Sequence, residues 1–190
     1  MRRDDSRVFA ACIRPTELSC VCSIYKDDWP CLVFMPASMR WTWAEELEKW
    51  LPDLRPGDVK VIKNGQDTDG LDGAKFCLCT YDLFVRSPVL RTVVHNHKFG
   101  MCIVDESHYC KNRDAKRTTC VESMARKVKR CVLLSGTPAV NRPVELFAQV
   151  AMIDANLLGS FSAFAVRHCD ARRGRFGWEY KGAVNLPVYN

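Results

Sequence analysis

Two adjacent carboxylates, Asp105 and Glu106, directly follow a short apolar run at residues 101–104. At the end of a strand, a first carboxylate can hold Mg²⁺, usually through water, and a second can orient an attacking water molecule. These are two tasks that nucleoside-triphosphate hydrolysis requires. Neighbouring acids alone are common on protein surfaces, but an apolar strand that ends in Asp-Glu-Ser-His is far more specific. We therefore take Asp105 and Glu106 as the candidate catalytic pair.

Two further apolar runs also end in polar residues. Residues 31–35 precede Pro36 and Ser38, and residues 131–134 precede Ser135-Gly-Thr. Ligands of open parallel sheets bind at the carboxyl ends of the strands. We expect the three polar tips to lie together and to form the site.

The elements that must position these tips alternate between strand and helix. Apolar runs predict strands at residues 31–35, 59–62, 76–80, 101–104 and 131–134. Helices are predicted at residues 18–25, 38–50 (capped by Ser38 or Thr42), 81–94 (broken at Ser87-Pro88), 119–130 and after Asn141. This alternation predicts an α/β fold, in which helices flank a mostly parallel sheet.

The net charge of +6 is unevenly distributed. Residues 111–130 include eight basic and two acidic side chains, so this segment alone accounts for the whole excess. Such a concentration suits the phosphate backbone of a nucleic acid. From charge alone, a solvated helix face is the simpler interpretation.

A second basic segment, residues 167–181, combines five basic with two acidic side chains. Phe176, Trp178 and Tyr180 alternate with other residues there. Basic and aromatic groups together suit nucleic acid, because charge holds phosphate and rings stack on exposed bases. We predict that Arg172 and Arg173 bind DNA; an ordered surface loop with packed aromatic rings is the alternative.

The eleven cysteines favour a reducing compartment, the cytosol or the nucleus. Most of them lie in apolar runs, where a thiol behaves as a small buried hydrophobic group. The chain has no C-x-x-C pair, which argues against a zinc site. The longest apolar runs are too short to cross a membrane, so we expect no membrane partner.

Several motifs resemble those of the Swi/Snf-type superfamily-two ATPases. Residues 103–108 with Lys111-Asn112 resemble motif II, and residues 133–138 resemble motif III. Residues 32–38 resemble motif Ia, and residues 80–82 resemble the next DNA-facing motif. The four motifs occur in the family's order. Three later segments resemble the annealing-helicase branch of this family, which rewinds DNA at stalled forks: residues 141–147, 168–173 and 177–180. With these segments, the resemblance covers residues 18–186.

The resemblance implies a partial RecA-like lobe with Mg-ATP as cofactor, forked or junction DNA as partner and a place in the nucleus, with replication or repair proteins as possible further partners. It implies that Asp105 binds the Mg²⁺ and that Glu106 activates water. Nucleotide-linked roles are implied for Ser107, His108, Ser135, Gly136 and Thr137, with His108 bridging motif II to motif III. Positions near the DNA backbone are implied for Pro36, Ser38, Thr80 and Tyr81.

The family's phosphate-binding loop, G-x-G-K-T, is missing. Its place would be near residues 11–15, but no glycine precedes Gly57, and Pro15 offers neither a hydroxyl nor an N–H. We predict that the strand before the loop is also missing, as are the adenine-binding segment and the second lobe, and that this exposes a sheet edge. Two alternatives stay open for the residues before Leu18, which either refold as a substitute for that strand or stay loose. The expected organisation is an atypical segment (1–17), a truncated RecA-like lobe (18–158) and a basic, aromatic segment of that lobe (159–190).

Two functions follow. The first is a fragment of an ATP-dependent DNA translocase or annealing helicase of DNA repair or fork remodelling, inactive alone because Mg-ATP is poorly held. The second is a non-catalytic DNA- or protein-binding module derived from such an ATPase. A nucleotide-binding enzyme unrelated to DNA would have to match the C-terminal segments of the annealing-helicase branch by chance.

Overall fold

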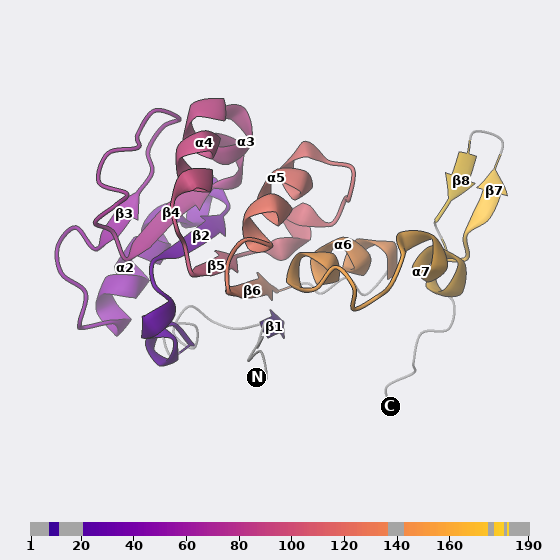
Figure 1. The fold of residues 1–190 in the computed structure, drawn as a ribbon, viewed down its shortest axis with the longest axis horizontal. Coiled ribbons are helices and arrows are strands. Elements are labelled where there is room, and N and C mark those ends of the chain that lie inside the picture. Colours follow the sequence, from indigo (N-terminus) through magenta and orange to yellow (C-terminus); the bar gives the residue numbers. More distant parts are fainter. Residues whose placement is uncertain (1–7, 12–20, 137–142, 175–176, 181, 183–190) are drawn as a thin grey trace.

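The computed structural model describes residues 8–11, 21–136, 143–174, 177–180 and 182, and Figure 1 shows their arrangement. Six strands form one sheet in the order β1-β6-β5-β2-β4-β3, and every neighbouring pair is parallel. The predicted α/β fold with a mostly parallel sheet is confirmed. The strands are β1 (Val8–Ala11), β2 (Cys31–Met35), β3 (Val59–Val61), β4 (Phe76–Thr80), β5 (Met101–Val104) and β6 (Arg130–Ser135).

Helices cover both faces of the sheet (Figure 1). Successive side chains of a strand point to opposite faces, so each central strand contributes to two apolar clusters. One cluster joins Leu32 and Cys102 to α3, α4, α5 and α6, and the other joins Val33 and Ile103 to α2. The helices are α2 (Arg40–Trp50), α3 (Tyr81–Arg86), α4 (Pro88–Asn96), α5 (Lys116–Ala125), α6 (Pro143–Ile153) and α7 (Phe161–His168).

The strand β1 corrects the prediction that this part of the sheet is missing. It pairs with β6 along its length, with Ala11 beside Ser135, so the edge of β6 is covered. The residues at 8–11 read Val-Phe-Ala-Ala, which has no alternating pattern. A run of four apolar residues carries no period of two, so hydrophobic periodicity alone does not identify it as a strand.

The helix boundaries differ from prediction mainly at their first turns. Residue Met39 precedes α2 without a side-chain cap, and Ser38 lies in the short 3-10 helix η2 (Ala37–Met39), so neither Ser38 nor Thr42 caps α2. The predicted break at Ser87 is confirmed, because its hydroxyl accepts a hydrogen bond from the Leu90 N–H and begins α4. In place of the helix predicted at 119–130, the structure has α5, which begins at Lys116 and ends at Ala125.

A smaller apolar cluster carries the C-terminal part of the chain beyond α6. Phe147 of α6 packs against Phe161 and Phe164 of α7, and Cys169 is fully buried beside them. After this cluster, β7 (Arg172–Gly174) and β8 (Gly177–Glu179) form an antiparallel hairpin at one end of the molecule (Figure 1).

The amino edge of the sheet is closed by a buried charge cluster. Asp28, in the 3-10 helix η1 (Lys26–Asp28), accepts hydrogen bonds from Lys129 and Arg130, and the Arg130 guanidinium lies 3.9 Å from the ring centre of Tyr25. Burial raises the pKa of Asp28, but the hydrogen bonds from the two cations outweigh it and hold the pKa below its usual value. A Cβ built at Gly100 would clash with the carbonyl oxygen of Asp28, so the backbones touch here.

In the described part of the chain, no helix is both long and apolar enough to cross a membrane.

Candidate active site

The strand ends that the sequence singled out meet at the carboxyl edge of the sheet. Val104 is in register with Phe34 on one side and with Leu133 on the other, and Met35 is in register with Thr80. Because these strands are parallel, the residues that follow them leave the sheet at the same edge. The expected convergence of the three polar tips is therefore confirmed for the residues that the structure describes.

Asp105 is held at this edge by neutral donors. The indole N–H of Trp43 donates to Oδ2 at 2.7 Å, and the backbone N–H of Glu106 donates to Oδ1 at 2.9 Å. The hydroxyl of Tyr81 donates to the backbone carbonyl oxygen of Asp105. Burial raises the pKa of the Asp105 carboxyl, and the hydrogen bonds from Trp43 and Glu106 offset only part of that rise. The carboxylate is thus fixed in place while its negative charge stays largely uncompensated.

Glu106 turns away from the strand direction. Its φ of 50° places it in the left-handed region, which non-glycine residues seldom occupy and which is common at functional sites. Its Oε2 lies 3.0 Å from Nδ1 of His108, out of line for a hydrogen bond, and the same Nδ1 lies 3.5 Å from the hydroxyl of Ser135. His108 therefore stands between the end of β5 and the end of β6, in the bridging position that the family resemblance implies.

Ser107 does not face the site. It is fully buried, in the 3-10 helix η3 (Ser107–Cys110), and its hydroxyl donates to the side-chain oxygen of Gln149 at 2.8 Å. The side chain ties the Asp105 turn to α6, and the nucleotide-linked role implied for Ser107 stays a prediction. Nothing in the local sequence predicts Gln149 as the partner, because it lies 42 residues further along.

The residues implied near DNA divide into exposed and buried pairs. Ser38 is exposed and Pro36 half-buried, so this turn is available to a ligand at the edge. Thr80 and Tyr81 are buried: Thr80 accepts from the Leu83 N–H and caps α3, and Tyr81 supports Asp105. Direct DNA contact through these two side chains does not fit their burial, and both act on the position of neighbouring residues instead.

A stack of aromatic rings connects the Asp105 turn to the surface. Tyr81 lies parallel to Tyr109 with ring centres 5.6 Å apart, and the Arg117 guanidinium lies over both rings. Tyr109 is 42% exposed. The sequence reasoning missed this stack as well as Trp43; the available signal was that a buried indole N–H needs an acceptor.

The remaining predicted site residues follow β6 or belong to the expected phosphate loop. Gly136 is exposed directly after β6. Thr137 and residues 12–15, where the phosphate loop was expected, lie outside the described residues.

The basic segment 111–130 is mostly neutralised. Lys127 donates to the carbonyl oxygen of His95, and Arg113 lies 4.6 Å from the ring centre of Phe161. The structure favours the interpretation as a helix face over that of a phosphate-binding surface. Five of its eight cations form ion pairs with acidic side chains: Lys111 with Glu145, Arg117 with Asp82, Arg126 with Glu122, and Lys129 and Arg130 with Asp28.

In the second basic segment, Arg172 and Arg173 are both exposed, and Arg172 pairs with Asp170 at 2.9 Å. Trp178 is 57% exposed, whereas Tyr180 is half-buried with its ring 5.2 Å from that of Phe161. Phe176 lies outside the described residues. The alternative prediction, a surface loop whose aromatic rings pack against the protein, is therefore right for Tyr180 and wrong for Trp178.

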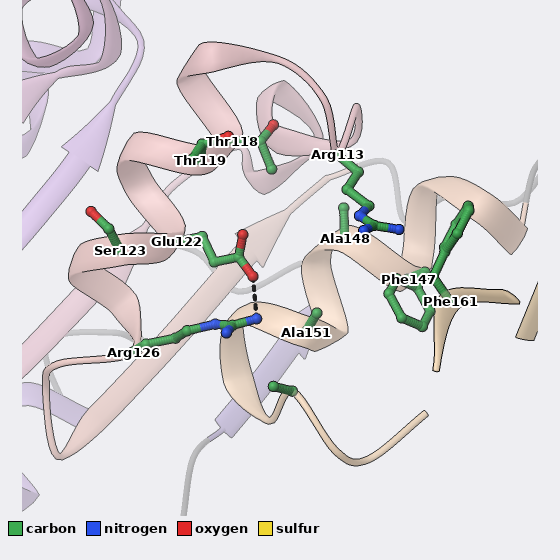
Figure 2. Close-up of a pocket in the computed structure, with 11 residues that line it drawn as sticks. Arg113, Thr118, Thr119, Glu122, Ser123, Arg126, Phe147, Ala148, Ala151 and Phe161 are labelled. Atoms are coloured by element: carbon green, nitrogen blue, oxygen red, sulfur yellow. Dashed lines mark hydrogen bonds and ion pairs between the residues drawn. The ribbon is translucent and has the colours of Figure 1, made fainter. Parts of the chain in front are cut away.

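A pocket of about 460 Å³ lies between α5 and α6, away from Asp105 and Glu106. Figure 2 shows Phe147, Ala148 and Ala151 of α6 facing α5, with Arg113 beside Phe161 and the Glu122–Arg126 ion pair at the other end. Because its arginines are engaged and the carboxylate pair does not line it, this pocket is not the predicted nucleotide site.

The carboxylates at the carboxyl edge suit the binding of the metal ion of Mg-ATP, which is one of its two requirements. A carboxylate with uncompensated charge is a ligand that Mg²⁺ prefers. The other requirement, a glycine-rich cradle for phosphates, has no counterpart in the sequence before Gly57.

Comparison with known proteins places this geometry in a family. The model of the SNF2-related domain matches residues 10–173. The chain is 39% identical over 167 residues to the bovine DNA annealing helicase and endonuclease ZRANB3, covering 85% of this chain and 16% of that protein. It is 41% identical over 166 residues to the Drosophila melanogaster SWI/SNF-related matrix-associated actin-dependent regulator of chromatin subfamily A-like protein 1, covering 87% and 21%.

Among solved structures, the Sulfolobus solfataricus SWI2/SNF2 ATPase core in complex with dsDNA is similar, with a TM-score of 0.68 and 26% identity. The match covers 80% of this chain and 30% of that one. The chain therefore spans 16% and 21% of the two curated relatives described above, and under a third of this structure.

Proposed function

The chain belongs to the SNF2-related family, and from this premise we propose that it is the first RecA-like lobe of an ATP-dependent DNA translocase of the annealing-helicase type. The observation that carries the proposal is the pair Asp105 and Glu106 at the carboxyl edge, linked through His108 to Ser135 on the neighbouring strand. Its work would lie in DNA repair or replication-fork remodelling in the nucleus, with replication or repair proteins as further partners.

Each residue of the pair has a distinct task in this proposal. Asp105 would hold Mg²⁺, and Trp43 orients one of its carboxylate oxygens. Glu106 orients the attacking water, and its left-handed backbone turns the carboxylate toward His108. When bound, Mg-ATP would supply the phosphoryl group. His108 and Ser135 would pass a change at Glu106 to the end of β6, and Gly136 and Thr137 follow there.

The absent G-x-G-K-T sequence leads us to propose that this chain does not hydrolyse ATP efficiently by itself. Backbone N–H groups of that loop hold the phosphates, and its Lys and Thr serve the terminal phosphates and the metal. The same observation favours the second candidate, a non-catalytic DNA- or protein-binding module. The division of the chain at residues 17 and 158 stays a prediction.

DNA binding is required by the first candidate and is one form of the second, and a salt series tests it. We expect the purified chain to bind duplex DNA of any sequence, with an affinity that falls steeply as salt rises. The double variant Arg172→Ala with Arg173→Ala should reduce the slope of log affinity against log salt by about one, because Arg172 is already paired with Asp170. The matched control, Lys98→Ala with Lys127→Ala, removes the same charge at the amino edge and should leave the slope unchanged. An affinity that does not change with salt, or equal slopes for the two double variants, would show that Arg172 and Arg173 do not form a DNA-binding surface.

A further inference from the structure

The hairpin of β7 and β8 brings one cation and one indole onto the same face. Arg173 is directly opposite Trp178 in the antiparallel register, and Arg172 is opposite Glu179. Directly opposite residues of an antiparallel pair project from one face with their Cβ atoms about 5 Å apart. Arg173 and Trp178 are therefore neighbours, and Arg172 belongs to the other face.

The charge on the two faces differs. Arg172 forms an ion pair with Asp170, whose oxygens lie 2.9 Å and 3.1 Å from the guanidinium nitrogens. In the described part of the chain, Arg173 has no such acidic partner, and its side chain is exposed. The uncompensated positive charge of the hairpin thus lies beside the indole.

The exposure of Trp178 contrasts with that of the next ring along the strand. Tyr180 packs edge-on against Phe161, which itself packs against Phe147, so this ring belongs to the apolar cluster of α6 and α7. Trp178 remains 57% exposed. An exposed tryptophan beside an arginine is the composition that contact surfaces favour.

The base of the hairpin is fixed. Cys169 is fully buried, and its carbonyl oxygen accepts a hydrogen bond from the N–H of Gly182 at 3.1 Å, which ties the two ends of the hairpin together. A Cβ built at Gly182 would clash with the side chain of Asp170, so the chain closes tightly here. A fixed arm presents its side chains with little further loss of entropy on binding.

We propose that this hairpin binds an unpaired DNA base at the boundary between duplex and single strand, with the Trp178 indole stacked on the base and Arg173 on the adjacent phosphate. The inference rests on the proposed function as a DNA-binding lobe and adds to it the two side chains that would contact the unpaired base and its phosphate. A flat ring beside a cation matches a base beside its phosphate. Inside a duplex, both faces of each base are covered by its neighbours, whereas an unpaired base beside the duplex can offer a free face to the indole.

The test compares three labelled DNA probes by fluorescence anisotropy with the full chain. They are a blunt duplex, the same duplex with a single-stranded overhang, and that overhang with abasic sites at its first unpaired positions. We expect the overhang to bind about tenfold more tightly than the blunt duplex, and the abasic overhang to lose this gain, because stacking on one base has about that effect.

Variants at Trp178 separate stacking from folding. Trp178→Phe retains a flat ring and should keep most of the preference for the overhang, whereas Trp178→Leu retains apolar bulk and should abolish it. Trp50→Ala removes another exposed indole, on α2, and should change nothing. Arg173→Ala should weaken binding to all three probes.

The outcomes distinguish the two levels of the proposal. Absence of any duplex binding by the wild-type chain would refute the DNA-binding function and the inference with it. Duplex binding without preference for the overhang, a preference that survives the abasic sites, or equal behaviour of Trp178→Phe and Trp178→Leu would overturn the hairpin assignment alone. Competition by polyglutamate as effective as that by the overhang would also overturn it, because the hairpin would then be a surface for acidic peptides.

Discussion

At the amino edge of the sheet Asp28 lies against two cations, whereas at the carboxyl edge Asp105 lies against an indole and a backbone N–H. Asp28 and Arg130 are each 7% exposed at their side chains, so their opposite charges cancel within the protein. The donors to Asp105 orient the carboxylate without cancelling its charge. A charge that the fold neutralises is structural, and one that the fold only orients is available to a ligand.

The two carboxyl groups should therefore respond to pH in opposite ways. The pKa of Asp28 is lowered, so the stability that it contributes is present above its unfolded pKa and is lost as pH falls through the folded value. The pKa of Asp105 is raised, so its burial costs no stability below the unfolded pKa, and the cost grows as pH rises from the unfolded value to the folded value.

The largest effect is expected for Asp28→Ala, which breaks the amino edge. It leaves the buried guanidinium of Arg130 without its carboxylate, and the free energy of unfolding should fall by about 3–5 kcal/mol. Urea denaturation at neutral pH measures this. Lys129→Ala removes the partner that is itself 58% exposed and should cost far less. Equal losses in the two variants would mean that Asp28 and Arg130 do not form the structural pair.

A second variant at the same edge tests its close packing. Gly100→Ala places a methyl group against the carbonyl oxygen of Asp28, and we expect a loss of about 1–3 kcal/mol in the free energy of unfolding. Gly73→Ala is the matched control, because a Cβ at Gly73 meets nothing within 4 Å. If Gly100→Ala is as stable as its control, the two backbones do not touch.

At the carboxyl edge, Trp43→Phe removes the donor to Asp105 and retains a ring. The unpartnered carboxylate oxygen should lower the free energy of unfolding by about 1–2 kcal/mol in the same denaturation assay. Trp50→Phe removes an exposed indole that donates to Glu46 and should be nearly neutral. A neutral Trp43→Phe would show that Asp105 is oriented by other groups.

The smallest effect is expected for Asp105→Asn, and it has the opposite sign. The amide removes a buried charge, and its oxygen can still accept from Trp43, but its NH2 group replaces the oxygen that accepts from the Glu106 N–H. Because the loss of that hydrogen bond offsets part of the relief, we expect a net gain of about 0.5 kcal/mol in the free energy of unfolding at neutral pH. The gain should vanish in acid, where Asp105 is protonated. Asp72→Asn, at a fully exposed side chain, serves as the control. A loss at neutral pH would contradict the uncompensated charge.

The sequence predicted what depends on local patterns. The strands β2, β4 and β5 begin and end where their apolar runs do, and their parallel order brings the polar tips to one edge. The short apolar run of β1 carried too little periodicity to be recognised. The caps of α2 were wrong because Ser38 is taken up by the preceding 3-10 turn.

What the sequence could not predict are contacts between distant residues. Trp43 lies 62 residues before Asp105, and Ser107 lies 42 residues before Gln149. Asp28 neutralises Arg130 although the two residues are 102 positions apart. The sequence alone therefore overestimated the uncompensated positive charge of the basic segment 111–130. These residues meet because of the order of the strands in the sheet, and that order cannot be predicted from composition or from the spacing of apolar residues.

The central claim is that the carboxyl edge carries the carboxylates of an ATPase site in a chain that lacks the glycine-rich loop needed to hold the phosphates. The most direct test measures hydrolysis of Mg-ATP by the purified chain, with and without duplex and forked DNA, beside the Glu106→Gln variant. We expect no DNA-stimulated hydrolysis and no difference between the two proteins. A DNA-stimulated rate that falls in Glu106→Gln would contradict it, since the phosphates would then be held by other residues of this chain.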